Sequence, residues 1–126
     1  MSTRGLVGIL NKDNSVTAIY NHFDSYFDAL GHDLVRSFRT TDEVLKLLER
    51  GSGSYILDKE GYTDGETNYH YGTLSEFLDK CREDVFIEYC YVWKDDKWYG
   101  MDCCEPGELE ILAEDGLPAS YERNKK

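Results

Sequence analysis

Short runs of apolar and β-branched residues near both ends of the chain predict antiparallel strands. GLVGIL at 5–10 and SVTAIY at 15–20 flank the turn-forming segment NKDN, which predicts a β-hairpin. VFIEYCYVW at 85–93 and WYGMD at 98–102 flank KDDK, which predicts a second hairpin. We therefore expect the sheet to be built from an N-terminal and a C-terminal hairpin.

Between the hairpins, apolar residues recur at spacings of three and four, which predicts helices. The first helix is expected at about 25–37, with Asp24 or Ser25 as its N-terminal cap. The other two are TTDEVLKLLER and TLSEFLDKCRE, and in each a threonine is followed by a glutamate three residues later. This spacing is the capping box, in which the two side chains satisfy free N–H groups at the helix start.

Strands and helices in this order do not alternate, which argues against a parallel α/β sheet. The pattern predicts an α+β fold, with a small antiparallel sheet and about three helices packed on one face. The chain, 1–126, is expected to form a single domain. Within it, the glycine-rich and charged segment 58–72 is expected to be a flexible loop, and 116–126 a frayed tail.

The charge of the chain restricts its partners. The net charge is −11, and residues 58–126 carry eighteen acidic and eight basic residues. Such a charge repels nucleic acid and anionic membranes and favours a partner with a basic surface. No apolar run is long enough to span a bilayer, and the N-terminus lacks the apolar core of a signal peptide. We expect a cytoplasmic protein without direct nucleic-acid or membrane binding; its oligomeric state is left open, a homodimer included.

The four cysteines are expected to be reduced thiols in that compartment. They are Cys81, Cys90, Cys103 and Cys104. No C-x-x-C pair occurs, and two of the four fall in a predicted helix and a predicted strand, where cysteine is commonly a small buried hydrophobe. A zinc site made from them with His70 is a minor alternative, and we expect neither a metal nor a cofactor.

Three segments together resemble a known family. SVTAIYNHFDSYFDALG, then TTDEVLKLLERGSGS, and later YCYVWKDDKWYGMD are similar to small acidic phage and prophage proteins of unknown function, which carry a motif of the type IYxHxDxY…G. The matching positions are His22, Asp24 and Tyr26, and the departures fall at Asn21, Phe23, Ser25 and Phe27. The resemblance implies a protein that is encoded by a mobile element and acts inside a bacterial cell. It assigns no activity.

Two hypotheses place a site at the first strand-to-helix junction. His22 and Asp24 form an H-x-D pair, which could hold a metal in a hydrolase or only bond to each other and the backbone. A pocket for a small ligand, such as a nucleotide signal, would be lined by Tyr20, His22, Asp24, Tyr26 and Arg36. The chain contains no G-x-S-x-G, H-E-x-x-H or phosphate-binding glycine motif, so we do not expect an enzyme.

The leading hypothesis is a phage-encoded, non-catalytic inhibitor of a host protein. Rows of carboxylates can replace nucleic-acid phosphates in a basic groove, which makes CRISPR and restriction effectors the expected targets. The acidic surface would comprise Asp58, Glu60, Asp64, Glu66, Glu76, Asp79, Glu83 and Asp84. Its aromatic anchors would be Tyr62, Tyr69 and Tyr71.

Overall fold

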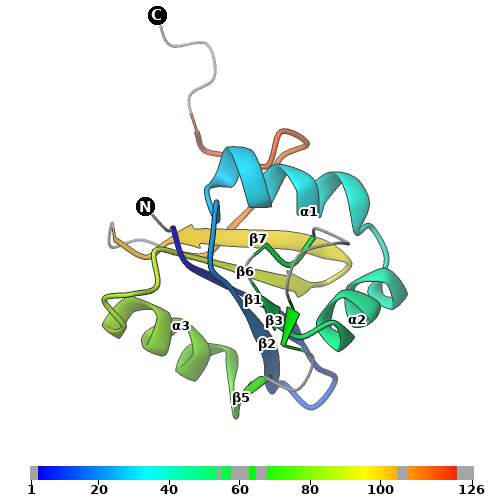
Figure 1. Cartoon of the computed structure of the whole chain (residues 1–126), viewed down its shortest axis with the longest axis vertical. Helices are drawn as coiled ribbons and strands as arrows, with labels where there is room; N and C mark the ends of the chain where they lie inside the picture. The colour runs from blue at the N-terminus through cyan, green and yellow to red at the C-terminus, as the bar shows by residue number, and fades with distance from the viewer. Residues whose placement is uncertain (1–2, 54, 58–62, 65–67, 105–107, 122–126) are drawn as a thin grey trace, which may run out of the picture.

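The fold is α+β, as the sequence predicts (Figure 1). The structure is a computed structural model, and it describes residues 3–53, 55–57, 63–64, 68–104 and 108–121. The elements are, in chain order, β1 (Gly5–Leu10), β2 (Val16–Asn21), the π-helical turn η1 (Phe27–Gly31), α1 (His32–Ser37), α2 (Thr41–Glu49), β3 (Ser52–Gly53), β4 (Thr63–Asp64), β5 (Tyr69–Tyr71), α3 (Leu74–Glu83), β6 (Tyr89–Lys94), β7 (Lys97–Asp102) and β8 (Glu110–Ile111). Among the described residues, every helix is too short or too polar to cross a bilayer.

Both predicted hairpins are confirmed. Strands β1 and β2 pair antiparallel with Leu10 opposite Val16, and β6 pairs with β7 across a two-residue turn. The turn residues Asp95 and Asp96 both have positive φ, 53° and 60°, which is the backbone of a type I′ turn. The hairpins are joined because β1 also pairs with β6, in the parallel direction.

The sheet is larger than the small antiparallel sheet expected, and it is mixed. In the described part of the chain its order is β4-β3-β2-β1-β6-β7-β8, and β5 also pairs with β2. The parallel β1–β6 pairing requires a long crossover connection, which the intervening helices supply. Such a pairing between distant segments leaves no local signal in the sequence.

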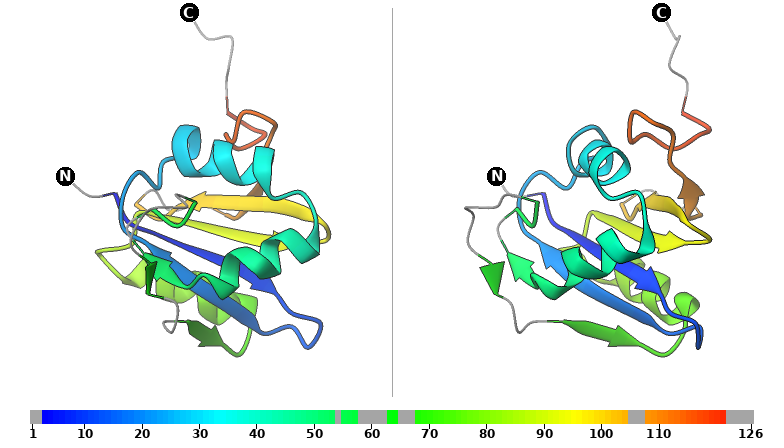
Figure 2. Two further views of the ribbon diagram at one scale, coloured as in Figure 1. Left: turned by 45° about the vertical axis from the view of Figure 1, so that its right-hand side comes forward. Right: turned by 90° about the vertical axis from the view of Figure 1, so that its right-hand side faces the viewer.

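The expectation that all helices pack on one face is wrong. Val7 and Ile9 of β1 belong to a core with α1 and α2, whereas Leu6 belongs to a second core with Phe77 and Cys81 of α3. Strands β1 and β6 are apolar on both sides, so both faces must be covered. Figure 2 shows α1 and α2 on one side of the sheet and α3 on the other.

The first helix begins differently from the prediction. Neither Asp24 nor Ser25 caps it: the chain enters η1 at Phe27 without a side-chain cap, and Asp24 has a positive φ of 57°. The two capping boxes are confirmed, because Thr40 accepts from the N–H of Glu43 and Thr73 accepts from that of Glu76.

Three further boundaries need correction. Strand β6 starts at Tyr89, so Val85 and Phe86 precede it and are 84% and 63% exposed. Parts of the expected loop 58–72 are strands, since β4 and β5 pair with β3 and β2; residues 58–62 and 65–67 lie outside the described residues. The expected frayed tail 116–126 is hydrogen-bonded as far as Tyr121, because Leu112 and Pro118 form a β-bridge, Ala119 donates to the carbonyl of Ile111 and Tyr121 donates to that of Pro118. Residues 122–126 lie outside the described residues.

Candidate functional site

A cleft of about 540 Å³ lies between η1, the β6–β7 hairpin and the C-terminal segment 108–121. This volume falls within the range of small-ligand sites. Its lining residues come from every part of that boundary: Tyr26, Phe27, Asp28, Tyr89, Gly100, Met101, Asp102, Glu108, Glu110, Leu117, Pro118, Ser120 and Tyr121. Figure 2 shows the C-terminal segment, in orange, beside the start of the η1–α1 helix.

A buried polar junction holds the η1 wall of the cleft. The side-chain amide of Asn21 donates to the carbonyl of Phe23 (2.7 Å) and to the hydroxyl of Ser25 (2.9 Å), and its oxygen accepts from the N–H of Ile56 (2.8 Å). The hydroxyl of Tyr91 donates to the carbonyl of Ser25 at 2.6 Å. Because Asn21, Ser25 and Tyr91 are fully buried, these bonds fix the path of the chain into Phe27 and Asp28.

The C-terminal wall of the cleft depends on a close approach between two backbones. Gly116 has a φ of +85°, and a Cβ there would lie 2.2 Å from the backbone nitrogen of His32. A Cβ on Gly31 would in turn lie 2.8 Å from the carbonyl oxygen of Gly116. Only glycines allow this contact, which holds residue 116 against the start of α1.

The cleft has an aromatic lining. The ring of Tyr89 meets Tyr26 and Phe27 edge-to-face, with ring centroids 6.0 and 5.0 Å apart. Burial, followed by the negative charge of Asp102, raises the pKa of Tyr89 to about 12. Tyr26 and Tyr121 also line the cleft, and the two residues are 44% and 55% exposed.

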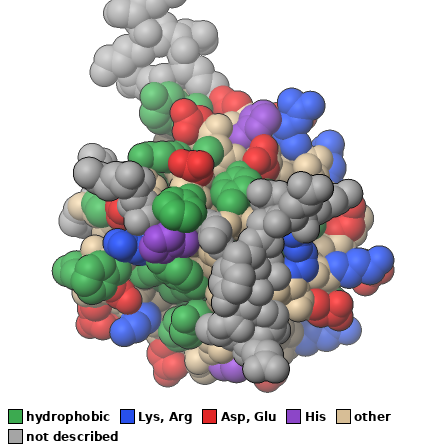
Figure 3. Space-filling view, viewed as in Figure 1, with side chains coloured by type: hydrophobic (Ala, Val, Ile, Leu, Met, Phe, Trp, Pro, Cys, Tyr) green, Lys and Arg blue, Asp and Glu red, His purple; other side chains and the backbone are tan. Residues whose placement is uncertain are grey.

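The cleft is also acidic. Four carboxylates line it, Asp28, Asp102, Glu108 and Glu110, and none of its described lining residues is Lys, Arg or His. Asp102 accepts a hydrogen bond from the N–H of Cys104 (3.0 Å), and no ion pair joins any of the four to a described basic side chain. On the face of the molecule in Figure 3, most basic side chains lie on the right-hand side, and a few lie at the left and lower left. The arrangement suits a cation, because aromatic faces and carboxylates both attract positive charge.

The five residues of the small-ligand hypothesis are not brought together. Tyr26 lines the cleft, whereas Tyr20 and His22 bond to each other elsewhere, with the Tyr20 hydroxyl 2.7 Å from Nδ1 of His22. Asp24 and Arg36 are exposed and line neither this cleft nor the Tyr20–His22 contact. The only grouping of metal-ligating atoms among the described residues does not include His22 or Asp24.

The predicted acidic surface is only partly described, and its described part is mixed in charge. Asp58, Glu60, Glu66 and Tyr62 lie outside the described residues, as does the side chain of Asp64. Glu76, Asp79 and Glu83 are exposed on α3, but Lys80 and Arg82 lie among them, and Arg82 is 3.5 Å from Asp79. Asp84 is half-buried and accepts from the N–H of Phe86 (2.9 Å).

The two described aromatic anchors differ. Tyr69 is exposed, as an anchor should be. Tyr71 packs edge-to-face on the buried Phe77, with centroids 5.2 Å apart, and burial raises its pKa to about 12. Tyr71 therefore belongs to the core beneath α3, and of the two described anchors Tyr69 is the one exposed on this surface.

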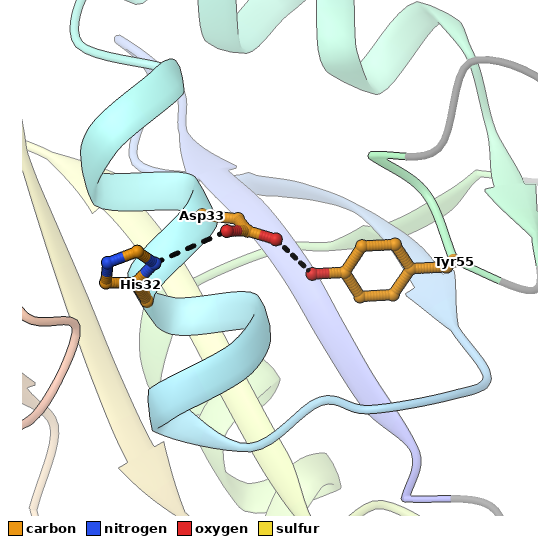
Figure 4. A network of polar contacts seen from close by, with 3 residues as sticks. All are labelled: His32, Asp33 and Tyr55. Atoms are coloured by element: carbon orange, nitrogen blue, oxygen red, sulfur yellow. Dashed lines mark hydrogen bonds and ion pairs between the residues drawn. The ribbon is translucent and has the colours of Figure 1, made fainter.

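A polar network at α1 joins two segments of the fold. Tyr55 donates to Oδ2 of Asp33 at 2.6 Å, and Nδ1 of His32 lies 3.4 Å from Oδ1 of the same carboxylate (Figure 4). Burial, followed by this hydrogen bond, raises the pKa of Tyr55 well above its usual range. Among the described residues, no Ser, Thr or Cys side chain bonds to His32.

Three cysteines form a cluster that their spacing did not predict. The Sγ atoms of Cys81, Cys90 and Cys103 lie within 4.8 Å of one another. Hydrogen bonds from Cys81 and Cys90 lower the pKa of Cys103, and the same bonds to Cys103 raise the pKa of its two partners. Cys103 is the half-buried member, whereas Cys104 is exposed and outside the cluster.

No protein-family model, curated protein or solved structure matches this chain significantly. Function is therefore inferred from the geometry of the chain itself.

Proposed function

We propose that this chain is a non-catalytic binding protein whose cleft receives a cationic side chain, Lys or Arg, of a partner protein. One observation carries the proposal: a cleft of about 540 Å³ combines four carboxylates with exposed aromatic rings and has no described basic lining residue. A cation over an aromatic face gains about 0.5–1 kcal/mol when exposed and about 2 kcal/mol when desolvated. The carboxylates add a charge-assisted hydrogen bond to that contact.

Binding would still depend on acidic side chains, as inferred from the sequence, but at the cleft and not on the surface of α3. Negative charge around α3 is interrupted by Lys80 and Arg82, whereas Asp28 of η1 and Glu110 of β8 both line the cleft, which has no described basic lining residue. The same charges disfavour an anionic nucleotide in the cleft. If the bound cation belongs to the basic nucleic-acid groove of a host enzyme, the chain acts as an inhibitor of that enzyme.

The direct test measures binding of a fluorescently labelled hexa-arginine peptide to the full chain. The double variant Asp28→Asn, Glu110→Gln should bind roughly tenfold more weakly. The control is Asp79→Asn, Glu83→Gln, which removes the same charge from α3 and should change affinity by less than about twofold. Stronger loss from the α3 variant than from the cleft variant would refute the proposed site.

An aromatic pair of variants separates cation–π contact from charge alone. Tyr26 in the cleft and Tyr69 on β5 are 44% and 40% exposed. Tyr26→Ala should weaken the peptide several-fold, and Tyr69→Ala should leave its affinity unchanged. Equal effects of the two substitutions would mean that Tyr26 makes no specific cation–π contact with the peptide.

The inhibitor version is tested by affinity capture from a nuclease-treated bacterial lysate, with the cleft double variant as the matched bait. Proteins retained by the natural chain, lost with the variant and released by added DNA or RNA support it. Proteins retained equally by both baits, or unaffected by nucleic acid, contradict it.

A further inference from the structure

The fold brings three thiols together beneath α3. Cys81 follows Phe77 by one helical turn, on the face that α3 turns toward the sheet. Cys90 lies on β6 opposite Met101 of β7, and both point to that same face. Cys103 is two residues beyond Met101, and its N–H bonds to the carbonyl of Glu88 at 2.8 Å, which continues the ladder and keeps Cys103 on this side.

The spacing of the sulfur atoms suits one metal ion. All three Sγ atoms lie within 4.8 Å of one another. Around a cation with metal–sulfur bonds of about 2.3 Å, ligand sulfurs stand roughly 3.8–4.0 Å apart. Small side-chain rotations that shorten the distances between the sulfurs by up to about 1 Å would therefore bring all three within bonding distance of one ion. A disulfide would require two of the sulfurs to approach to about 2.05 Å and would leave the third unused.

We propose that Cys81, Cys90 and Cys103 form a site for one thiophilic closed-shell cation, zinc(II) or copper(I). Soft thiolate ligands select these ions over hard cations. Cys81 and Cys90 are fully buried among apolar side chains, where thiolates need a cation to balance them. On binding, the ion forms three metal–sulfur bonds and the displaced thiol protons pass to solvent.

The half-buried Cys103 gives the ion a route from the surface. Among the described residues, the grouping contains no His, Asp or Glu ligand. Copper(I) would therefore be held by three sulfurs, and zinc(II) would complete four-coordination with solvent on the Cys103 side. The two ions share one ligand chemistry and are distinguished by the experiment.

The first test titrates the reduced, chelator-treated full chain with zinc(II), and separately with copper(I) under anaerobic conditions, each against a chromophoric competitor. One ion should bind per chain. Cys103→Ser should weaken binding by at least roughly tenfold, whereas Cys104→Ser, at the adjacent exposed cysteine, should leave it within about twofold. Binding of copper(I) alone selects the three-coordinate form, and binding of zinc(II) selects the form with solvent.

The second test needs no variant and so does not depend on the variant's folding. Alkylation of the natural chain is followed by mass spectrometry with and without the bound ion. The ion should slow modification of Cys103 and leave that of Cys104 unchanged. The proposal would be overturned if neither ion bound one-to-one, or if Cys103 were modified at equal rates with and without the ion.

Discussion

The hydroxyl of Tyr91 donates a 2.6 Å hydrogen bond to the backbone carbonyl of Ser25, deep in the core between β6 and the entry to η1. In Tyr91→Phe the carbonyl loses its donor in a place that water does not reach. We expect the free energy of unfolding to fall by about 1–3 kcal/mol, measured by urea denaturation. Tyr99→Phe is the control, since Tyr99 contacts Lys94 through its ring, with Nζ of Lys94 4.1 Å from the centroid. Equal losses of unfolding free energy in both variants would contradict a stabilising role for this hydrogen bond.

Asn21→Ala should destabilise the chain more. The substitution removes three hydrogen bonds from a fully buried side chain and leaves the N–H of Ile56 without its acceptor. The expected loss is about 2–4 kcal/mol, again by denaturation, against less than about 0.5 kcal/mol for the exposed Asn68→Ala. A loss for Asn21→Ala no greater than the control's would mean that the junction is not held by this amide.

Gly116→Ala should loosen the C-terminal wall of the cleft. A methyl group there would meet the backbone of His32 at 2.2 Å and Phe27 at 2.5 Å, and the φ of +85° is unfavourable for alanine. We expect faster hydrogen exchange at the N–H of Ala119, which bonds to Ile111, and weaker binding of the hexa-arginine peptide. Gly72→Ala is the control, because its methyl would meet only the flexible carboxylate of Glu76, and it should leave both readings unchanged.

Stability should decrease with pH above about 10. The pKa values of Tyr71 and Tyr89 rise from 10.0 to about 12 in the fold, mainly through burial. The folded chain therefore keeps two protons that the unfolded chain loses. Their stabilising contribution is complete below pH 10 and is lost as the pH rises toward 12. Urea denaturation between pH 8 and 11 should show a shallower decline in Tyr71→Phe and Tyr89→Phe than in the natural chain, and an unchanged slope would contradict the assignment.

Local chemistry in the sequence predicts the elements that depend on it. The type I′ turn at Asp95–Asp96 and the two threonine caps follow from interactions between residues a few positions apart. The entry to η1 could not be predicted in this way, because Ser25 bonds to Asn21 and accepts from Tyr91, far along the chain. A motif that reads as a helix cap is instead a buried junction.

Both sites are formed by contacts between segments that are distant in the sequence. The sequence alone therefore predicts only some of their residues. Tyr26 was among the residues expected to line a pocket, but its neighbours in the cleft come from β6, β7 and residues 108–121. Cys90 and Cys103 meet because of the β6–β7 register, and Cys81 joins them only when α3 covers that face. Neither grouping shows a spacing signature along the chain.

The central claim is that the cleft is the binding surface, and amide NMR mapping of the hexa-arginine peptide on the natural chain tests it most directly. At physiological salt we expect the largest shift changes at residues 26–28, 89, 100–102 and 108–121, which line the cleft or form its C-terminal wall. Shift changes centred on α3 or β5, or no localised change at all, would contradict the account.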